Sequence, residues 1–321
     1  MKRSTSSLLV LLVALVVTQV QAQTFPSKTV HAVVPYAVGG TVDLQARLYS
    51  DRLSRLWNVP VVVENRAGAN GNIGTDYLAR AAADGYTFGV ISSQHAMAPA
   101  LFAKLPFALS DFKAISVTAQ TRMALLVRSD FPANTVAELI AYAKANSGKV
   151  TAGIAGPATA NNIWLKMFEK STGTRMLAVP YRGSGPAHIE LMAGRLDIMF
   201  DAPGAVLQHI QAGRIKVLAM GGSGRADILP AVPSLDEAGY PAGKLMASWT
   251  VVLVPSKTPP EIVDKLGRDF IAVLKDPDVK QRLAAAGLEV LGWEPAESDK
   301  HVFREADRLT QLIREYNIVA E

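Results

Sequence analysis

Cysteine is absent from this 321-residue chain, and histidine is scarce. Without cysteine the chain forms no disulfide and no thiolate metal site, so packing alone has to stabilise its core. None of the five histidines belongs to a His-Glu-x-x-His pattern, and no metal site is expected. A chain of this length can bury a large core without covalent cross-links, and its length indicates two domains.

The common catalytic and nucleotide-binding motifs are also missing. The sequence contains no Gly-x-Ser-x-Gly nucleophile elbow and no Gly-Lys-Ser/Thr phosphate loop. Gly68, Gly71 and Gly74 are spaced Gly-x-x-Gly-x-x-Gly, which is not the dinucleotide fingerprint. We therefore expect no cofactor and a function other than catalysis.

A single long apolar run is present, near the start of the chain. It covers residues 8–17, follows Lys2 and Arg3, and precedes Val20-Gln21-Ala22, the pattern of a signal-peptidase site. A run of about ten residues is too short to span a bilayer, which needs about twenty. The pattern predicts a cleaved signal peptide over residues 1–22 and a periplasmic location. The alternative is an uncleaved membrane anchor.

Neither sign of charge dominates the composition. The chain has 33 Lys and Arg against 28 Asp and Glu, and a formal net charge of +5. The basic residues are scattered, with no arginine stripe interleaved with aromatic residues. Nucleic-acid binding is therefore not expected, whereas a mildly positive balance suits a small anionic ligand.

Short apolar runs alternate with amphipathic segments along the chain. Strands are expected at 30–34, 61–64, 87–91, 150–154, 176–179 and 196–200, and helices at 44–56, 77–83, 136–146, 161–171 and 187–193. Three further helices are expected at 260–274, 277–285 and 297–316. Strands that alternate with helices are typical of βαβ units, and they predict an α/β fold of mostly parallel sheets flanked by helices.

Two strands mark places where the chain crosses between domains. Residues 125–128 lead into a polar segment and a new helix near Thr135, and residues 248–254 lead into a proline-rich segment. One self-contained α/β unit lies between these points, which predicts domain 2 over residues 125–251. Domain 1 is then built from both ends of the mature chain, residues 23–124 and 252–321.

In open parallel sheets, ligands bind where strands end and loops lead into helices. In the loop from Pro35 to Asp43, adjacent Gly39 and Gly40 precede a predicted helix. Glycines let the backbone expose its N–H groups, and the helix adds unpaired N–H groups and a positive dipole end, which together suit a carboxylate. The alternative is a tight turn in which Asp43 or Thr41 caps the helix.

Other loops that adjoin predicted strands carry further candidates. Residues 180–187 suit an anion or form an ordinary loop with a solvated arginine, and residues 155–162 offer Asn161 as a donor or as a helix cap. His95 reaches a ligand or is a bystander, and Asp201 pairs with Asp197 or marks a strand end. The ligand-binding candidates are Tyr36, Ala37, Gly39, Gly40, Thr41, Asp43, Ser93, His95, Thr159, Asn161, Arg182, Gly183, Ser184 and Asp201.

Several motifs along the mature chain are those of one known family. The chain resembles the substrate-binding proteins of tripartite tricarboxylate transporters, the Bug-type periplasmic receptors. The motifs are Val33-Val34-Pro35-Tyr36 with Gly39-Gly40 and Asp43, the Val61 to Gly68 segment with Gly71 to Gly74, Asp84 to Thr87, Thr135 to Leu139, Val179 to Ser184, Asp197 to Asp201, Pro233 to Gly239, and Ser248-Trp249.

The resemblance implies a type II-like periplasmic binding protein whose two domains are joined by two hinge crossings and close on a ligand. It implies that backbone N–H groups of Gly39, Gly40 and Thr41 hold a carboxylate, and that residues 181–187 close from the other domain. The implied function is capture of a small carboxylate (an organic acid, dicarboxylate or aromatic acid) for the permease subunits of such a transporter. A monomer is expected.

The chain departs from the family pattern in the loop at residues 155–162. The family usually carries serine or threonine near Ala155 and Gly156 and a histidine near Asn162, whereas this chain has Gly156-Pro157 and Asn161-Asn162. This loop is expected to set specificity, so the sequence does not select one acid. The alternative function is a ligand-sensing subunit that signals to a membrane kinase or regulator through the same cleft.

Overall fold

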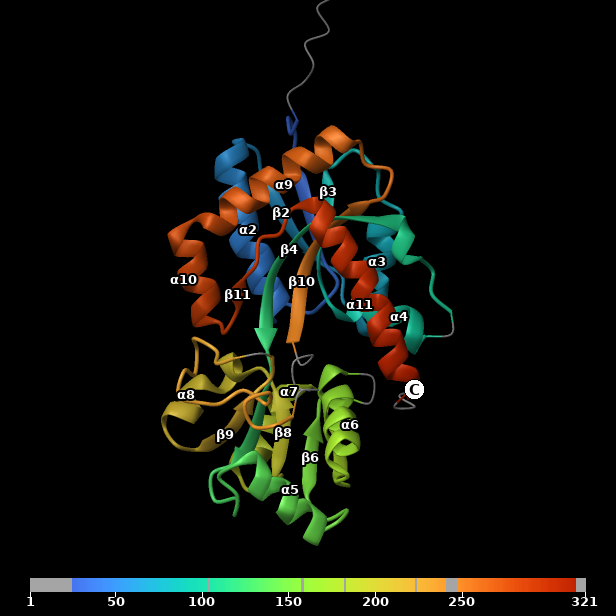
Figure 1. The fold of residues 1–321 in the computed structure, drawn as a ribbon. Helices are drawn as coiled ribbons and strands as arrows, with labels where there is room; N and C mark the ends of the chain where they lie inside the picture. The colour runs from blue at the N-terminus through green and yellow to red at the C-terminus, as the bar shows by residue number, and fades with distance from the viewer. Residues whose placement is uncertain are drawn as a thin grey trace, which may run out of the picture.

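The structure, a computed structural model, describes residues 25–102, 104–156, 159–181, 183–222, 224–240 and 247–315. The expected signal peptide lies outside these residues. Two separate sheets, each flanked by helices, form an upper and a lower domain in the view of Figure 1. In the described part of the chain, no helix is both long enough and apolar enough to span a membrane.

The first sheet has six strands in the order β11-β4-β10-β3-β1-β2. They are β1 (Val30–Val34), β2 (Val61–Asn65), β3 (Thr87–Ser92), β4 (Phe112–Arg122), β10 (Ala247–Pro255) and β11 (Glu289–Val290). β1 pairs in parallel with both β2 and β3, because the chain returns through a helix after β1 and again after β2. β10 runs antiparallel to β3 and β4.

Helices cover both faces of this sheet (Figure 1). They are α2 (Thr41–Trp57), α3 (Asn72–Ala79), α4 (Gln94–Leu101), α9 (Pro260–Lys275), α10 (Pro277–Ala285) and α11 (Pro295–Glu315), with short 3-10 turns η1 (Ala69–Gly71) and η2 (Leu109–Asp111). Tyr49 of α2 and Phe88 of β3 each pack edge-on against Phe270 of α9, and all three are fully buried.

The second sheet has five strands in the order β7-β6-β8-β5-β9. Its elements are β5 (Ala124–Arg128), α5 (Val136–Ala145), β6 (Thr151–Ile154), α6 (Ala160–Thr172), β7 (Leu177–Pro180), α7 (Ser184–Met192), β8 (Ile198–Asp201), η3 (Pro203–Val206), α8 (Leu207–Gln211) and β9 (Ile215–Met220). β6 pairs in parallel with β7 and β8, whereas β5 is antiparallel to β8 and β9.

Most expected strands and helices are confirmed within a few residues. The antiparallel pairing of β5 and β10 has one cause: they are the strands by which the chain enters each sheet from the other domain, so neither follows a βαβ crossover. Met123 alone separates β4 from β5. The expected boundary between residues 251 and 252 falls inside β10, which pairs with the first sheet from Ala247 onward. We therefore propose that the second crossing lies before Ala247.

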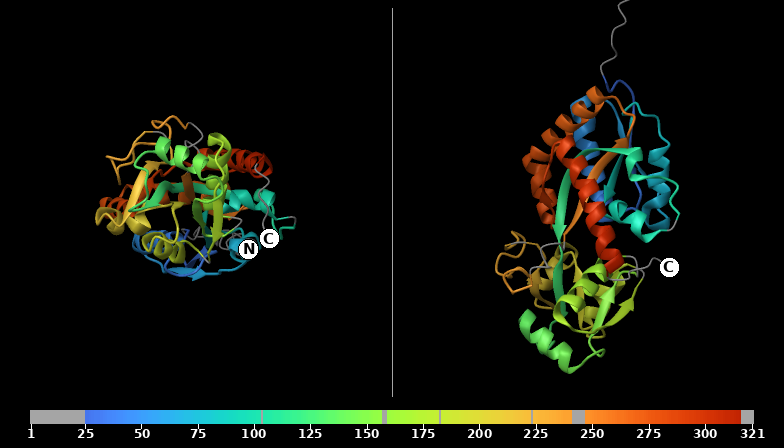
Figure 2. Two further views of the ribbon diagram at one scale, coloured as in Figure 1. Left: turned by 90° about the horizontal axis from the view of Figure 1, so that it is seen from below. Right: turned by 45° about the vertical axis from the view of Figure 1, so that its right-hand side comes forward.

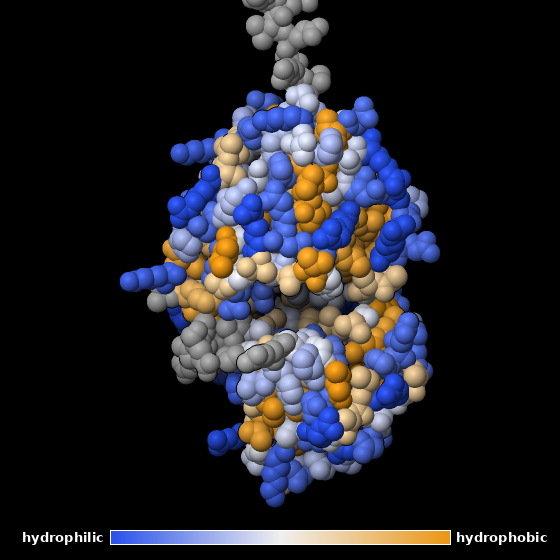
Figure 3. Space-filling model, turned by 180° about the vertical axis from the view of Figure 1, so that it is seen from behind, coloured by the Kyte–Doolittle hydropathy of each residue, from blue (hydrophilic) through white to orange (hydrophobic). Residues whose placement is uncertain are grey.

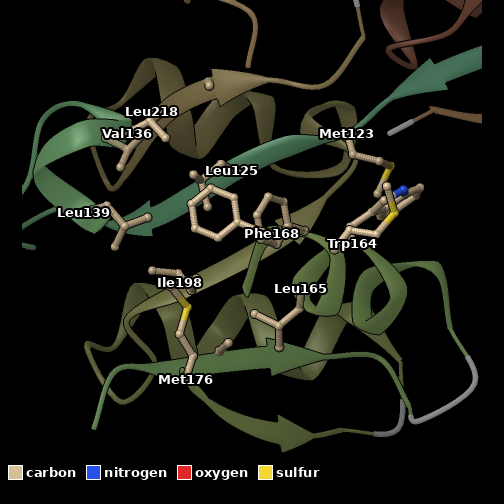
Figure 4. Packing of buried hydrophobic residues seen from close by; sticks show 14 of the residues in the cluster. Met123, Leu125, Val136, Leu139, Trp164, Leu165, Phe168, Met176, Ile198 and Leu218 are labelled. Atoms are coloured by element: carbon tan, nitrogen blue, oxygen red, sulfur yellow. The ribbon is translucent and has the colours of Figure 1, made fainter. Parts of the chain in front are cut away.

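The core of the second sheet extends to the neighbouring domain. Its buried cluster includes Trp164 and Phe168 of α6 together with Met97 of α4 and Ile313 of α11. Figure 4 shows Met123 and Trp164 together at one end of this cluster. The end of α11 reaches the lower domain beside α6, as the right-hand view of Figure 2 shows. The two domains are therefore joined by side-chain packing as well as by the chain segments that cross between them.

Candidate ligand-binding cleft

A cleft separates the two domains and opens on the face shown in Figure 3. It holds a cavity of about 410 Å³, within the range of small-molecule sites. Its first wall is the start of α2, the ends of β3 and β4, and β10; its second wall is the start of α6, the end of β8, and η3. The lining residues include Gly39, Gly40, Thr41, Val42, Ser92, Thr121, Met123, Ala160, Asn161, Trp164, Asp201, Gly204, Ser248 and Thr250.

The glycine loop presents the N-terminus of α2 to the cleft. Gly40 is the N-cap residue, in extended conformation, and it has no side chain that could accept from the first turn. The first intrahelical bond is donated by the Leu44 N–H to the Gly40 carbonyl, so the N–H groups of Thr41 and Val42 have no helical partner. An uncapped 17-residue helix therefore directs free donors and its positive dipole end at the cleft.

Asp43 holds this loop in place from behind. Its buried carboxylate accepts from the Gly39 N–H at 3.0 Å, from Arg47 Nε at 3.0 Å and from Asn65 Nδ2 at 2.8 Å. Burial raises the pKa of Asp43, but the hydrogen bonds from Arg47, Gly39 and Asn65 outweigh it and leave the pKa below its usual value. Asp43 thus braces the loop and occupies the Gly39 N–H.

Two polar side chains at neighbouring strand ends fix the rest of the loop. Asn65, the last residue of β2, donates to the Tyr36 carbonyl at 3.1 Å. The Tyr36 hydroxyl lies 2.7 Å from the Ser92 Oγ at the end of β3. The role of Asn65 was not predicted among the site candidates, although its position at the carboxyl end of a strand beside the glycine loop is a signal that the sequence contains.

The opposite wall presents a second helix N-terminus. Ala160 and Asn161 begin α6 and line the cleft. The N-cap residue, Thr159, makes no capping bond, and its hydroxyl donates to the Gly156 carbonyl at 2.6 Å. Asn161 is not the cap: its amide donates to the Phe200 carbonyl at 2.6 Å and ties α6 to β8. Two uncapped helix starts, one from each domain, therefore line one cavity.

Asp201 is the one ionisable side chain among the described residues that line the cleft. Its Oδ1 accepts from the Ala202 N–H at 2.8 Å, and its Oδ2 lies 2.8 Å from His188 Nε2 of α7. The second contact lacks the alignment of a hydrogen bond and is an ion-pair contact when His188 is protonated. Both side chains are about nine-tenths buried, so Asp201 faces its own domain more than the cleft.

The structure brings five of the sequence candidates together in the cleft: Gly39, Gly40, Thr41, Asn161 and Asp201. Tyr36, Ala37, Asp43 and Thr159 lie behind this lining, in the loops that carry it. Gly183 and Ser184 begin α7 one strand further out, outside the lining. Arg182 lies outside the described residues.

Two remaining candidates, Ser93 and His95, lie on the side of α4. Ser93 pairs with Ser248 at 3.0 Å and lines a small space that shares Ala160 and Trp164 with the cleft. His95 is buried between Phe107 and Phe112, at ring-centroid distances of 5.7 and 4.9 Å, within an apolar cluster of the first domain. The structure places it outside the cleft lining.

Comparison with known proteins identifies the family. The model of the tripartite tricarboxylate transporter family receptor matches residues 45–318. Protein BugT of Bordetella pertussis is 33% identical over 300 residues, which cover 92% of this chain and 91% of that protein.

Two solved structures from Rhodopseudomonas palustris share the fold. Rpa4515 with adipate is 32% identical with a TM-score of 0.82, and covers 92% of this chain and all of its own. MatC with bound malate is 29% identical with a TM-score of 0.77, and covers 90% of this chain and all of its own. With a family model matched over residues 45–318 and this shared two-domain periplasmic-binding-protein fold, the chain belongs to the tripartite tricarboxylate transporter receptor family of periplasmic solute-binding proteins.

Proposed function

We propose that this protein captures a small carboxylate in its interdomain cleft and delivers it to the membrane subunits of a tripartite tricarboxylate-type transporter, and that it does not chemically change its ligand. The observation that carries the proposal is the uncapped start of α2, which lines the cleft with free N–H groups. An uncapped helix N-terminus favours an anion through both its dipole and its unpaired donors.

An anionic ligand in this cleft would be held by backbone donors and not by a charged side chain. No Lys, Arg or His is among the described residues that line the cavity, so backbone donors of α2 have to offset the desolvation of a carboxylate. Met123, Trp164 and Leu288 supply apolar surface for the body of the acid. The structures of relatives with adipate and malate favour an aliphatic acid of similar size.

Thermal denaturation of the mature protein, which we propose begins at Gln23, tests the proposed function. The protein is melted against a panel of mono-, di- and tricarboxylates, amino acids and sugars. A carboxylate at 100 times its Kd should stabilise the protein by about 2.7 kcal/mol and raise its Tm by about 5 °C. Stabilisation by sugars or cations, with none by any carboxylate, would contradict the proposal.

Delivery to a transporter is tested separately in cells. Uptake of the identified acid should require both this receptor and the membrane subunits of the transporter. Uptake that needs the subunits and not the receptor, together with co-purification of a membrane kinase, would instead favour the sensor function.

A further inference from the structure

Beside the cleft, the two domains touch backbone to backbone. Gly204 of η3 belongs to the second domain, and Ala286 and Gly287 form the turn after α10 of the first domain. A Cβ added to Gly204 would lie 2.9 Å from the Ala286 carbonyl carbon, 3.2 Å from the Gly287 Cα, and closer still to the Ala286 carbonyl oxygen. Each of these contacts is with backbone atoms, so no side-chain rotation can relieve them.

The backbone conformation of Gly204 does not itself require glycine. Gly204 is not among the glycines with positive φ, so alanine could adopt its conformation without strain. The obstacle to a side chain at this position is therefore the opposite domain. Only the other domain restricts the side chain at position 204. A larger residue at this position should therefore change how closely the two domains approach.

This contact also separates two cavities. Gly204 and Ala286 line the ligand cleft, whereas Gly287 lines a second interdomain cavity of about 600 Å³, and Leu288 lines both. The second cavity contains charged side chains, including Arg122, Lys280 and Asp227. Parting Gly204 from the Ala286–Gly287 turn would join the two cavities and widen the opening of the cleft on this flank.

The other flank of the cleft is held by a different kind of contact. There, Ile313 of α11 and Met97 of α4 pack into the core of the second domain, and Lys170 pairs with Glu315. The contacts on that flank are made by side chains, which can change rotamer when the domains move. The Gly204 contact is made by backbone atoms, which cannot. The Gly204 flank therefore sets the limit of approach.

We propose that the absence of a side chain at Gly204 allows this flank of the cleft to close, and that residue 204 is a positioning residue for ligand capture. The consequence for affinity rests on the proposed function, but the consequence for domain approach does not. Gly204→Ala should keep the domains apart at this flank, and Gly204→Val should do so further. Neither change touches the core of either domain.

Spin-label distances in the ligand-free protein test the proposal directly. Because the chain has no cysteine, Arg55→Cys on α2 and Lys144→Cys on α5 provide exposed label sites, one in each domain. The labelled protein with Gly204 should show a population with a short interdomain distance. The labelled proteins with Gly204→Ala or Gly204→Val should lack this population. Ala143→Gly, a change at a buried position inside α5 that destabilises the protein by at least about 1 kcal/mol, serves as the control and should retain that distance.

Affinity for the acid found by thermal denaturation is then measured on the same variants. If the ligand binds the closed form, Gly204→Ala should raise its Kd about tenfold, in proportion to the lost closed population, and Ala143→Gly should leave it unchanged. Identical distance distributions in Gly204→Ala, Gly204→Val and the wild type would overturn the proposal, whatever binds. If the variants differ from the wild type in interdomain distance as expected but the protein binds no carboxylate, the proposal for Gly204 stands and the proposed function is contradicted.

Discussion

Gly40→Asp should abolish carboxylate binding, with a loss of at least about 100-fold in affinity, while the protein stays as stable as the wild type within about 1 kcal/mol. The new carboxylate would stand at the N-cap of α2, where it accepts from the N–H groups that we assign to the ligand. The variant would carry its own anion in the binding position. Charge-assisted hydrogen bonds of about 1.5–3 kcal/mol each account for the size of the loss.

The local geometry accepts this substitution. Gly40 has φ −77° and ψ 168°, the extended conformation typical of an N-cap aspartate. A Cβ there would approach only the Ala37 carbonyl oxygen, at 3.7 Å, an ordinary contact. Capping and the helix dipole favour the new side chain by a few tenths to about 1 kcal/mol, whereas repulsion from the nearby carboxylate of Asp43 offsets part of that gain.

Two matched variants at the same position separate charge from bulk. Gly40→Ala adds a Cβ without an acceptor and should bind nearly as well as the wild type. Gly40→Asn adds a neutral cap of the same shape and should fall between Ala and Asp. Isothermal titration with the acid identified by thermal denaturation gives the three affinities. Equal affinity in Gly40→Asp and Gly40→Ala would show that the anion binds elsewhere.

The fold was predictable because its strands and loops have clear local signals. Buried strands such as β10 contain continuous apolar runs, here Val251 to Val254, and glycine or proline marks most of the turns. The strands β4, β9 and β11 and the helices α4 and α8 were not predicted, and β4 and α4 show why. The strand β4 (FKAISVTAQTR) mixes apolar residues with Lys113 and Arg122, and the helix α4 (QHAMAPAL) contains Pro99, which disfavours a helix interior. Long-range pairing with β10 and packing against α11 stabilise them, and neither contact is visible in local sequence.

The candidate site was predictable where it depends on backbone and not where it depends on side-chain direction. The sequence predicts either an anion-binding loop or a tight turn at Gly39-Gly40, and the structure places this pair in the lining of the cleft. The inward direction of Asp43 depends on Arg47 and on the distant Asn65, and the direction of Asn161 depends on the Phe200 carbonyl. Apolar lining residues such as Trp164 carry no chemical signal that distinguishes them from core.

His95, expected as a ligand contact, becomes in the structure a source of acid sensitivity. Burial lowers its pKa to about 4, because the apolar surroundings disfavour the charged ring. Among the described residues neither ring nitrogen has a hydrogen-bond partner. In the unfolded chain the same imidazole has a pKa of about 6.5. Between these two values the unfolded chain binds a proton that the folded protein does not.

The sign of the effect follows from this difference. The contribution of the unprotonated His95 ring to stability is fully present above about pH 6.5. It is lost as the pH falls toward 4, because protonation favours the unfolded chain. The loss attributable to His95 should be about 2 kcal/mol at pH 5 and approach about 3 kcal/mol near pH 4. His301 is shifted in the same direction by burial, which lowers its pKa, and should add a smaller contribution.

Urea denaturation at pH 7 and pH 5 measures this loss. His95→Leu keeps the apolar contacts with Phe107 and Phe112 and removes the titrating ring, so the variant should lose about 2 kcal/mol less than the wild type between the two pH values. His209→Gln, on the surface of α8, is the matched control and should behave as the wild type. The same pH dependence in His95→Leu and the wild type would mean that the buried imidazole reaches solvent or a proton partner in solution. His95 would then regain its place among the candidates for ligand contact.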